Sequence, residues 1–201
     1  SLTLFTDEQV DRNIFGQEIK TSVFQSINAI YIIILGPIFA ALWAWLAKRG
    51  KNPSAPFKFG LAVIQLGLGF LVLVAGATAA GGNLTPVLFI FLIYLLHTTG
   101  ELCMSPVGLS AMTRLSPLKM VGLMMGAWFL ASGAGNAVAA LIAQATAVEG
   151  PDGEPMVLAV YSRVGWVAIG IGVLMVLASP WLKKAMYLDT LRDDDPAEAF
   201  Q

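Results

Sequence analysis

Five long apolar runs constrain the fold of this chain more than any other feature of its sequence. They cover residues 24–47, 57–80, 86–114, 119–147 and 158–182, and each is long enough to cross a bilayer as an α-helix. The composition agrees, because 57% of the residues are hydrophobic and only 12% are charged. This balance excludes a soluble domain and predicts an all-α membrane protein with five transmembrane helices.

Turn-forming segments separate the runs and sometimes interrupt them. Ser22 and Gln25 fit a capping box at the start of the first helix, and the Gly36–Pro37 pair predicts a kink within it. We expect residues 1–20 to be the end of a preceding helix followed by an extracellular loop. Residues 21–184 then form the helical bundle, and residues 185–201 form a cytoplasmic tail.

Basic residues gather in alternate loops and so predict the orientation. Nine of the 12 Lys and Arg residues fall on one side of the expected membrane: Lys48, Arg49, Lys51, Lys58, Arg114, Lys119, Lys183, Lys184 and Arg192. The positive-inside rule makes that side cytoplasmic in a plasma membrane, which for a bacterial protein is the inner membrane. The acidic loop at residues 149–155 then lies outside. An odd number of spans without a signal peptide predicts the C-terminal part of a larger transporter or channel, whose missing N-terminal half is a partner.

One acidic residue, Glu101, lies deep inside the third apolar run. It is 15 residues after Pro86 and 13 before Arg114, so a helix would hold it roughly 20 Å from either end, near the bilayer midplane. An intramembrane carboxylate is costly and is a functional candidate by default. The alternative is a protonated Glu that holds helices together by hydrogen bonding to Thr98, Ser105 or a backbone carbonyl.

Polar residues at helical spacing surround Glu101. Tyr94, His97, Glu101 and Ser105 are spaced by three, four and four residues, which predicts a polar stripe that faces the bundle interior. His97 is either a structural hydrogen-bonding residue or a proton relay. Gln65 in the second run is expected to be satisfied by its own helix.

The fourth run carries a weaker stripe made of Trp128, Ser132 and Asn136, at intervals of four residues. Trp128 lies too deep for an interfacial tryptophan, so it is either a core aromatic or the wall of a pocket. Ser132 and Asn136 are either pocket residues or interhelical hydrogen-bonding groups. The small residues of this run, which include Gly122, Gly126 and Gly133, suit close approach of neighbouring helices.

Several function classes are excluded at this stage. The single cysteine, Cys103, rules out an internal disulfide and any cysteine-based metal site, and we expect no cofactor. A net charge of −1 argues against nucleic-acid binding. An intramembrane serine protease built on Ser110 fails, because the one histidine, His97, lies 13 residues away on the same helix, about 20 Å distant.

The residues around Glu101 carry a family resemblance. Residues 100–110, GELCMSPVGLS, followed by TRLSP at 113–117, resemble the tenth transmembrane helix of the proton-dependent oligopeptide transporter family. FQSIN at residues 24–28 with Gly36–Pro37 resembles that family's eighth helix, and MMGAWFL at 124–130 resembles its eleventh. The resemblance extends over nearly the whole of residues 24–184 and is closest to bacterial members.

The resemblance implies five helices of the C-terminal six-helix bundle of a major facilitator fold, with most of helix seven missing. It also implies proton-driven symport of di- and tripeptides by alternating access, and therefore no enzyme activity. By resemblance, Glu101 binds the peptide amino terminus and couples protons, with help from Asn28. Ser105 lies in the same cavity, and Trp128 with Ser132 lines a pocket for a peptide side chain.

Two alternatives remain from the sequence alone. A different major facilitator transporter, for sugars, nitrate or drugs, would share this topology. A structural subunit of a membrane complex, which does not transport, would use Glu101 only to hold helices together.

Overall fold

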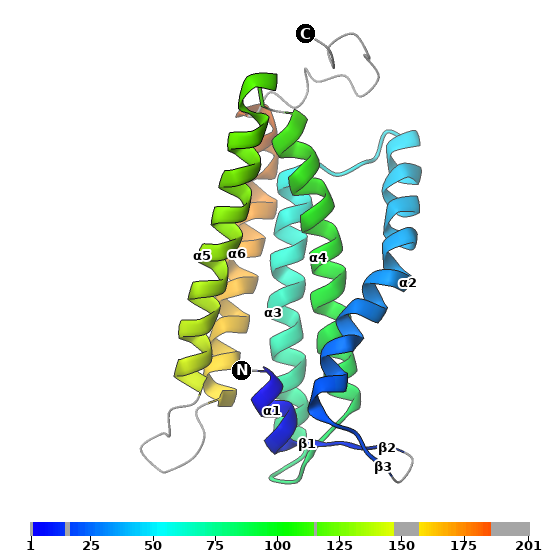
Figure 1. The fold of residues 1–201 in the computed structure, drawn as a ribbon, viewed down its shortest axis with the longest axis vertical. Helices are drawn as coiled ribbons and strands as arrows, with labels where there is room; N and C mark the ends of the chain where they lie inside the picture. The colour runs from blue at the N-terminus through cyan, green and yellow to red at the C-terminus, as the bar shows by residue number, and fades with distance from the viewer. Residues whose placement is uncertain (1, 15–16, 115, 147–156, 186–201) are drawn as a thin grey trace.

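Five long helices dominate the computed structural model, which describes residues 2–14, 17–114, 116–146 and 157–185. The helices are α2 (Thr21–Lys48), α3 (Ala55–Ala79), α4 (Leu88–Arg114), α5 (Val121–Thr146) and α6 (Val157–Ala185). All five are long and apolar enough to cross a membrane, and they lie lengthwise beside one another (Figure 1). The predicted class, an all-α membrane protein with five transmembrane helices, is confirmed.

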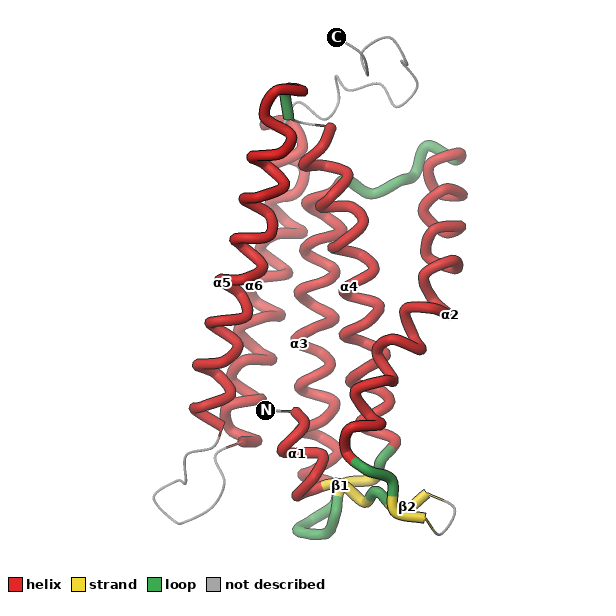
Figure 2. Tube along the Cα trace, in the orientation of Figure 1, coloured by secondary structure: helices red, strands yellow, loops and turns green. Residues whose placement is uncertain are grey.

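Short elements lie at both ends of the bundle. At one end are α1 (Leu2–Gln9) and the strands β1 (Val10–Asp11), β2 (Asn13–Ile14), β3 (Gln17–Glu18) and β4 (Thr85–Pro86). At the opposite end is a 3-10 helix (Leu118–Met120). β1 pairs in parallel with β4, and β2 pairs antiparallel with β3 (Figure 2). Gly81 and Gly82 have positive φ angles of 59° and 90° in the loop before β4, a conformation that glycine adopts without strain.

Helix α3 is the centre of the bundle and packs against both α6 and α4. Its contact with α6 depends on paired glycines. A Cβ atom on Gly67 would lie 2.5 Å from the carbonyl oxygen of Gly165, and a Cβ on Gly172 would lie 2.8 Å from that of Gly60. The missing side chains therefore let the two backbones touch.

The glycines of α5 behave differently from our expectation. A Cβ added to Gly122, Gly126, Gly133 or Gly135 would meet nothing within 4 Å, so the predicted close approach to neighbouring helices is not seen. In the described part of α5 no side chain is buried. The close glycine contacts lie between α3 and α6 instead.

Helix α2 is also peripheral and bends about halfway along its length (Figure 2). Pro37 lies inside this helix and removes one backbone hydrogen bond, which accounts for the bend. Only Phe24 and Ile27 of α2 are buried, both near its start. The part of α2 after the bend leans away from α4 (Figure 1).

The start of α2 differs from the predicted capping box. The helix begins at Thr21, and the N-cap residue Lys20 makes no side-chain capping bond. Gln25 instead donates a hydrogen bond to Thr3 of α1 at 3.2 Å. The hydroxyl of Thr21 donates to Asp7 at 2.6 Å, and Arg12 forms an ion pair with Asp7 at 3.4 Å. Long-range contacts with the N-terminal segment thus replace the local cap.

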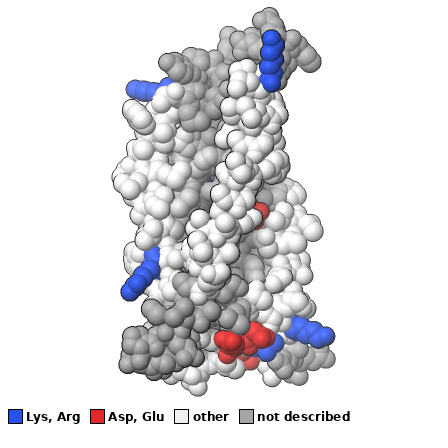
Figure 3. Space-filling model, turned by 60° about the vertical axis from the view of Figure 1, so that its left-hand side comes forward, with Lys and Arg blue, Asp and Glu red and all other residues white. Residues whose placement is uncertain are grey.

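Charged side chains concentrate at the two ends, and most of the wall between them is uncharged (Figure 3). We call the end that carries Lys48, Arg49, Lys51, Lys119 and Lys184 the basic end, and the end with Asp7, Glu8 and Asp11 the acidic end. The main apolar core lies near the acidic end and includes Phe5, Phe24 and Tyr161. The predicted acidic loop at residues 149–155, Arg192 and all but the first residue of the predicted tail lie outside the described residues.

Candidate functional site

Glu101 lies at the midpoint of α4, since the helix runs from Leu88 to Arg114 and so extends 13 residues on either side. At 1.5 Å per residue, each half is roughly 20 Å long. Glu101 is exposed, whereas Gly100 and Cys103 beside it are buried. Among the described residues, no hydrogen bond or ion pair engages its carboxylate. The helix therefore presents an unpaired acid at its centre.

The opposite face of α4 packs on α3. Thr99 donates a hydrogen bond to the amide oxygen of Gln65 at 2.5 Å, and the amide nitrogen of Gln65 lies 3.8 Å from Sγ of Cys103. A Cβ on Gly100 would lie 3.0 Å from the carbonyl oxygen of Ala62. Cys103 is two residues from Glu101, which places their side chains roughly 160° apart around the helix. Glu101 thus points away from α3.

The contact of Gln65 with α4 corrects our sequence interpretation. We expected this amide to be satisfied by its own helix, but its partners Thr99 and Cys103 belong to α4. A buried amide in a membrane protein stabilises helix pairing when the neighbouring helix supplies its hydrogen bonds. Gln65 therefore helps to fix the rotation of α4.

Asn28 of α2 lies one turn from Glu101. Its Oδ1 accepts a hydrogen bond of 2.5 Å from the hydroxyl of Thr98, a residue that is fully buried. Thr98 is three residues before Glu101 on α4, so the bond holds Asn28 on the same side of α4 as the carboxylate. From the sequence we considered Thr98 only as a hydrogen-bond partner of Glu101, although its spacing of three and seven residues from Glu101 and Ser105 also indicates that it shares their helix face.

Trp128 of α5 packs against α4 on the other side of Glu101. A Cβ on Gly108 would lie 2.1 Å from the indole ring of Trp128, so the ring occupies the space that a side chain at Gly108 would fill. Ser132 donates its hydroxyl to the carbonyl oxygen of Trp128 at 3.0 Å, within its own helix. Gly108 is the residue that sequence reasoning missed here.

These contacts define one face of α4. Thr98, Glu101, Ser105 and Gly108 follow one another at intervals of three, four and three residues, so they share a face of the helix. α2 contacts the first of them through Asn28, and α5 contacts the last through Trp128. Ser105 is partly buried. The structure thus brings Asn28, Glu101, Ser105 and Trp128 to one side of α4, with Glu101 and Ser105 between the two flanking helices.

His97 lies at the edge of this face and contacts α3. Its Nε2 lies 3.2 Å from the carbonyl oxygen of Leu66 on α3, and its ring packs edge-on against Phe70 with centroids 5.0 Å apart. The predicted stripe of four polar residues is therefore divided, because His97 contacts α3 while Glu101 is exposed. Of the two roles we considered for His97, the structural one matches these contacts.

The helix-holding alternative for Glu101 required a bond to Thr98, Ser105 or a backbone carbonyl. Thr98 instead donates to Asn28, and in the described part of the chain the carboxylate has no such partner. An exposed carboxylate on a polar face can attract a cation and can exchange a proton with water. The described residues contain no group of three His, Cys, Asp or Glu able to hold a metal ion.

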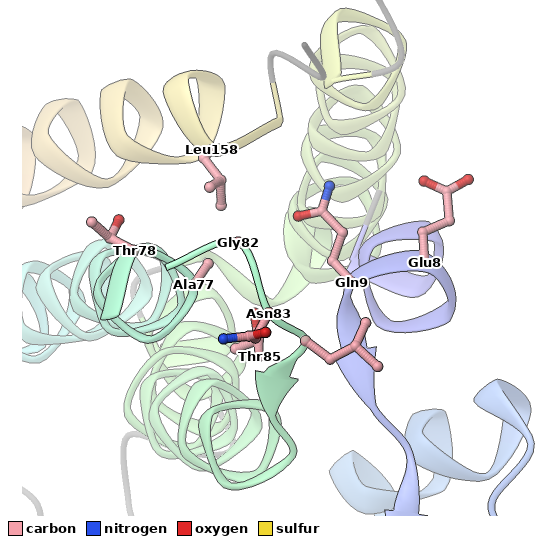
Figure 4. Close-up of a pocket in the computed structure, with 9 residues that line it drawn as sticks. Glu8, Gln9, Ala77, Thr78, Gly82, Asn83, Thr85 and Leu158 are labelled. Atoms are coloured by element: carbon pink, nitrogen blue, oxygen red, sulfur yellow. The ribbon is translucent and has the colours of Figure 1, made fainter. Parts of the chain in front are cut away.

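A cavity of about 470 Å³ lies elsewhere, at the acidic end. It is lined by the end of α1, the end of α3, the following loop and the start of α6 (Figure 4). Its polar lining residues include Glu8, Gln9, Thr78 and Asn83. None of the predicted site residues lines this cavity.

Comparison with known proteins shows which protein family this chain resembles. The sequence model of the POT family matches residues 1–159 of this chain. The peptide transporter YePEPT of Yersinia enterocolitica is 43% identical over 146 residues, which are 71% of this chain and 28% of that protein. Dipeptide and tripeptide permease B of Salmonella typhimurium is 33% identical over 190 residues, which are 92% of this chain and 39% of the permease.

The fold has a counterpart among solved structures. A crystal structure of a peptide transporter, POT, in complex with sulfate superposes with a TM-score of 0.81 at 32% identity. The match covers 91% of this chain and 36% of that transporter. The chain therefore spans less than two fifths of the length of these relatives.

Proposed function

Because this chain belongs to the POT family, whose solved members have the major facilitator fold, we propose that it is part of a proton-coupled symporter for di- and tripeptides. The transporter works by alternating access, and this chain supplies five helices of its C-terminal bundle. The names of the relatives, a peptide transporter and a dipeptide and tripeptide permease, support peptides as the substrate. Peptides, protons and the lipid bilayer are its partners, together with the N-terminal half of the same transporter.

The observation that carries the proposal is the unpaired carboxylate of Glu101 at the centre of α4. Ionised, it binds the ammonium group of the peptide amino terminus, because a charge-assisted hydrogen bond is strong where water is scarce. Protonated, it loses that attraction. One residue can therefore exchange a proton for a cationic group. Symport also requires that the displaced proton travel with the peptide, and we place the group that holds it in the N-terminal half of the transporter.

Asn28 and Ser105 complete the binding site for the amino terminus. An amide oxygen has two lone pairs, so Oδ1 of Asn28 can accept a second hydrogen bond, from an ammonium group, while it keeps the one from Thr98. Ser105 lies one turn along α4 from Glu101, and its hydroxyl has no hydrogen bond among the described residues. Both side chains are thus available to a ligand beside the carboxylate.

Trp128 and Ser132 line the pocket for a peptide side chain. The indole of Trp128 supplies an apolar wall, and its contact with Gly108 keeps it next to α4. Ser132 contributes less, because its hydroxyl already donates to the carbonyl oxygen of Trp128. We therefore expect Trp128 to influence which peptides bind.

The basic end faces the cytoplasm of a bacterial cell, and the protein resides in the inner membrane. The supporting observation is the concentration of Lys48, Arg49, Lys51, Lys119 and Lys184 at that end, in agreement with the positive-inside rule. Transport of sugars, nitrate or drugs, and a purely structural role, are not favoured by any contact at Glu101.

The test is proton-driven peptide accumulation by the full-length protein in vesicles. Glu101→Gln and Glu101→Ala should each abolish accumulation while the protein stays folded in the membrane, because neither side chain exchanges a proton near neutral pH. Glu8→Gln is the matched control, since Glu8 is exposed at the acidic end, and it should transport normally. Full accumulation by either Glu101 variant would reject the proposal.

A further inference from the structure

An exposed apolar stripe runs along one face of α2 toward the basic end. Ile34, Ile38, Leu42 and Trp45 follow one another at intervals of four, four and three residues, so they share a face. Their exposed fractions are 55%, 55%, 39% and 48%. The stripe lies mostly beyond Pro37, in the half of α2 that leans away from α4 (Figure 1).

Two cations cap this stripe. Lys48 and Arg49 lie three and four residues after Trp45 and are exposed. The Cζ atom of Arg49 is 3.9 Å from the centroid of a Trp45 ring, a cation–π contact. An apolar stripe that ends in an indole and a cation has the profile of a membrane-water boundary, where tryptophan is enriched and basic side chains reach the surface.

Among the residues that the structure describes, no carboxylate pairs with these cations. From residue 21 to residue 100 the sequence contains no Asp or Glu. In the part of the chain that the structure describes, neither Lys48 nor Arg49 forms an ion pair. The two positive charges are therefore open, within the described part of the chain, to an anion from another molecule.

The shape of the stripe favours a lipid over another helix as that molecule. Helices that pack in membranes meet through small residues, as Gly67 and Gly165 do in this bundle. The stripe instead consists mostly of Ile, Leu and Trp side chains, with the small residue Ala41 between Ile38 and Trp45. Small exposed residues of α2, Ala40, Ala44 and Ala47, lie on a different face, and Ala44 is roughly 100° around the helix from Trp45.

We propose that this face of α2 binds an anionic phospholipid, with an acyl chain along Ile34, Ile38 and Leu42 and the phosphate group on Lys48 and Arg49. Trp45 lies at the boundary between the two parts of the lipid. The inference concerns the lipid-facing surface and is independent of peptide binding at Glu101.

Native mass spectrometry of the full-length protein with phosphatidylglycerol or phosphatidylcholine tests the headgroup contacts. The wild type should retain phosphatidylglycerol preferentially. Lys48→Gln with Arg49→Gln should weaken that binding about fivefold for each charge removed. Lys119→Gln with Lys184→Gln is the matched control, since it removes two exposed cations from the same end, and it should bind normally. Equal retention of the two lipids, or equal loss in both double variants, would overturn the proposal.

A second measurement tests the acyl-chain contact even if lipid is lost during purification. A nitroxide label is attached at Ile38→Cys or Ala44→Cys in a background without other cysteines, and collision with oxygen is measured in phosphatidylglycerol vesicles. The label at position 38 should collide with oxygen more often than the label at position 44. A shielded label at position 38 would mean that a partner helix covers the stripe, which would refute lipid binding.

Discussion

At Gly108 the absence of a side chain decides where the indole of Trp128 can lie. A Cβ there would come within 2.1 Å of the ring, a separation that no pair of nonbonded carbons adopts. Trp128 therefore rests directly on the α4 backbone, seven residues along that helix from Glu101. The position of the proposed side-chain pocket depends on this one contact.

Trp128→Ala should change the order in which peptides compete for uptake without abolishing transport, because it removes an apolar wall and leaves Glu101 in place. Gly108→Ala should act in the same direction by displacing the ring. We expect shifts of roughly tenfold for peptides with large apolar side chains, as for other apolar pocket contacts. Competition assays with a panel of dipeptides measure this order.

Gly170→Ala provides the control for the glycine variant. Gly170 is also in a long helix, but a Cβ there would meet nothing within 4 Å, so peptide ranking should stay as in the wild type. An unchanged ranking in both Trp128→Ala and Gly108→Ala would reject the pocket.

The candidate site illustrates what single residues reveal in a sequence. Glu101 could be predicted as a candidate because an acid inside an apolar run is conspicuous whatever the fold. The contacts of Thr98 with Asn28 and of Gly108 with Trp128 could not be predicted, because they depend on which residues of α2 and α5 face α4. His97 was predicted to share the face of Glu101, but it lies on the side of that face next to α3, where Leu66 and Phe70 are its partners.

Among the elements, the α3–α6 pair is the tightest in the bundle. Gly60 and Gly67 on α3 face Gly172 and Gly165 on α6, and each pair lies seven residues from the other on both helices. Apolar side chains gain little by leaving lipid for another helix, so backbone contact of this kind supplies much of the packing energy.

Gly67→Ala should destabilise this pair by about 1–3 kcal/mol, the usual cost of overpacking. The added Cβ would lie 2.5 Å from a backbone oxygen that cannot move aside alone. Denaturant titration of the purified protein in detergent measures the loss. Gly170→Ala on α6 should leave the unfolding midpoint near that of the wild type, and an equal loss in both variants would contradict the packing account.

The sequence predicted the long helices well and their pairing poorly. Apolar run length alone identifies five spans, since a membrane demands about 20 apolar residues per helix. Run length does not identify which glycines make close contacts between helices. The glycines of α5 were expected to do so, but a Cβ added to them would meet no neighbouring atom, whereas the glycines of α3 and α6 contact one another's helix. Likewise, the predicted capping box at Ser22 does not form. The first turn of α2 instead makes hydrogen bonds with Thr3, Asp7 and Arg12 of the N-terminal segment.

For the whole molecule, the proposed orientation rests on the excess of basic residues at one end. The basic end carries exposed lysines from four different loops or helix ends, while the acidic end carries Asp7, Glu8 and Asp11 together with Arg12 and Lys20. Translocation of such lysines is disfavoured, which is the physical content of the positive-inside rule.

Labelling from outside the cell should therefore distinguish the two ends. Asn83 and Asn52 are exposed at the acidic and basic ends, respectively. Asn83→Cys should react with a membrane-impermeant maleimide in intact cells, whereas Asn52→Cys should react only after permeabilisation. The buried thiol of Cys103 provides a low background. The reverse pattern would invert the proposed orientation.

The central claim is that the Glu101 carboxylate binds the amino terminus of the peptide, and a binding cycle tests it most directly. Affinities of a dipeptide and its N-acetylated form are measured by calorimetry for the full-length protein and for Glu101→Gln. We predict that acetylation weakens binding to the wild type by about 10- to 100-fold, the range for a hydrogen bond to a charged group, and has little effect on the variant. An equal effect of acetylation on both proteins would contradict the account.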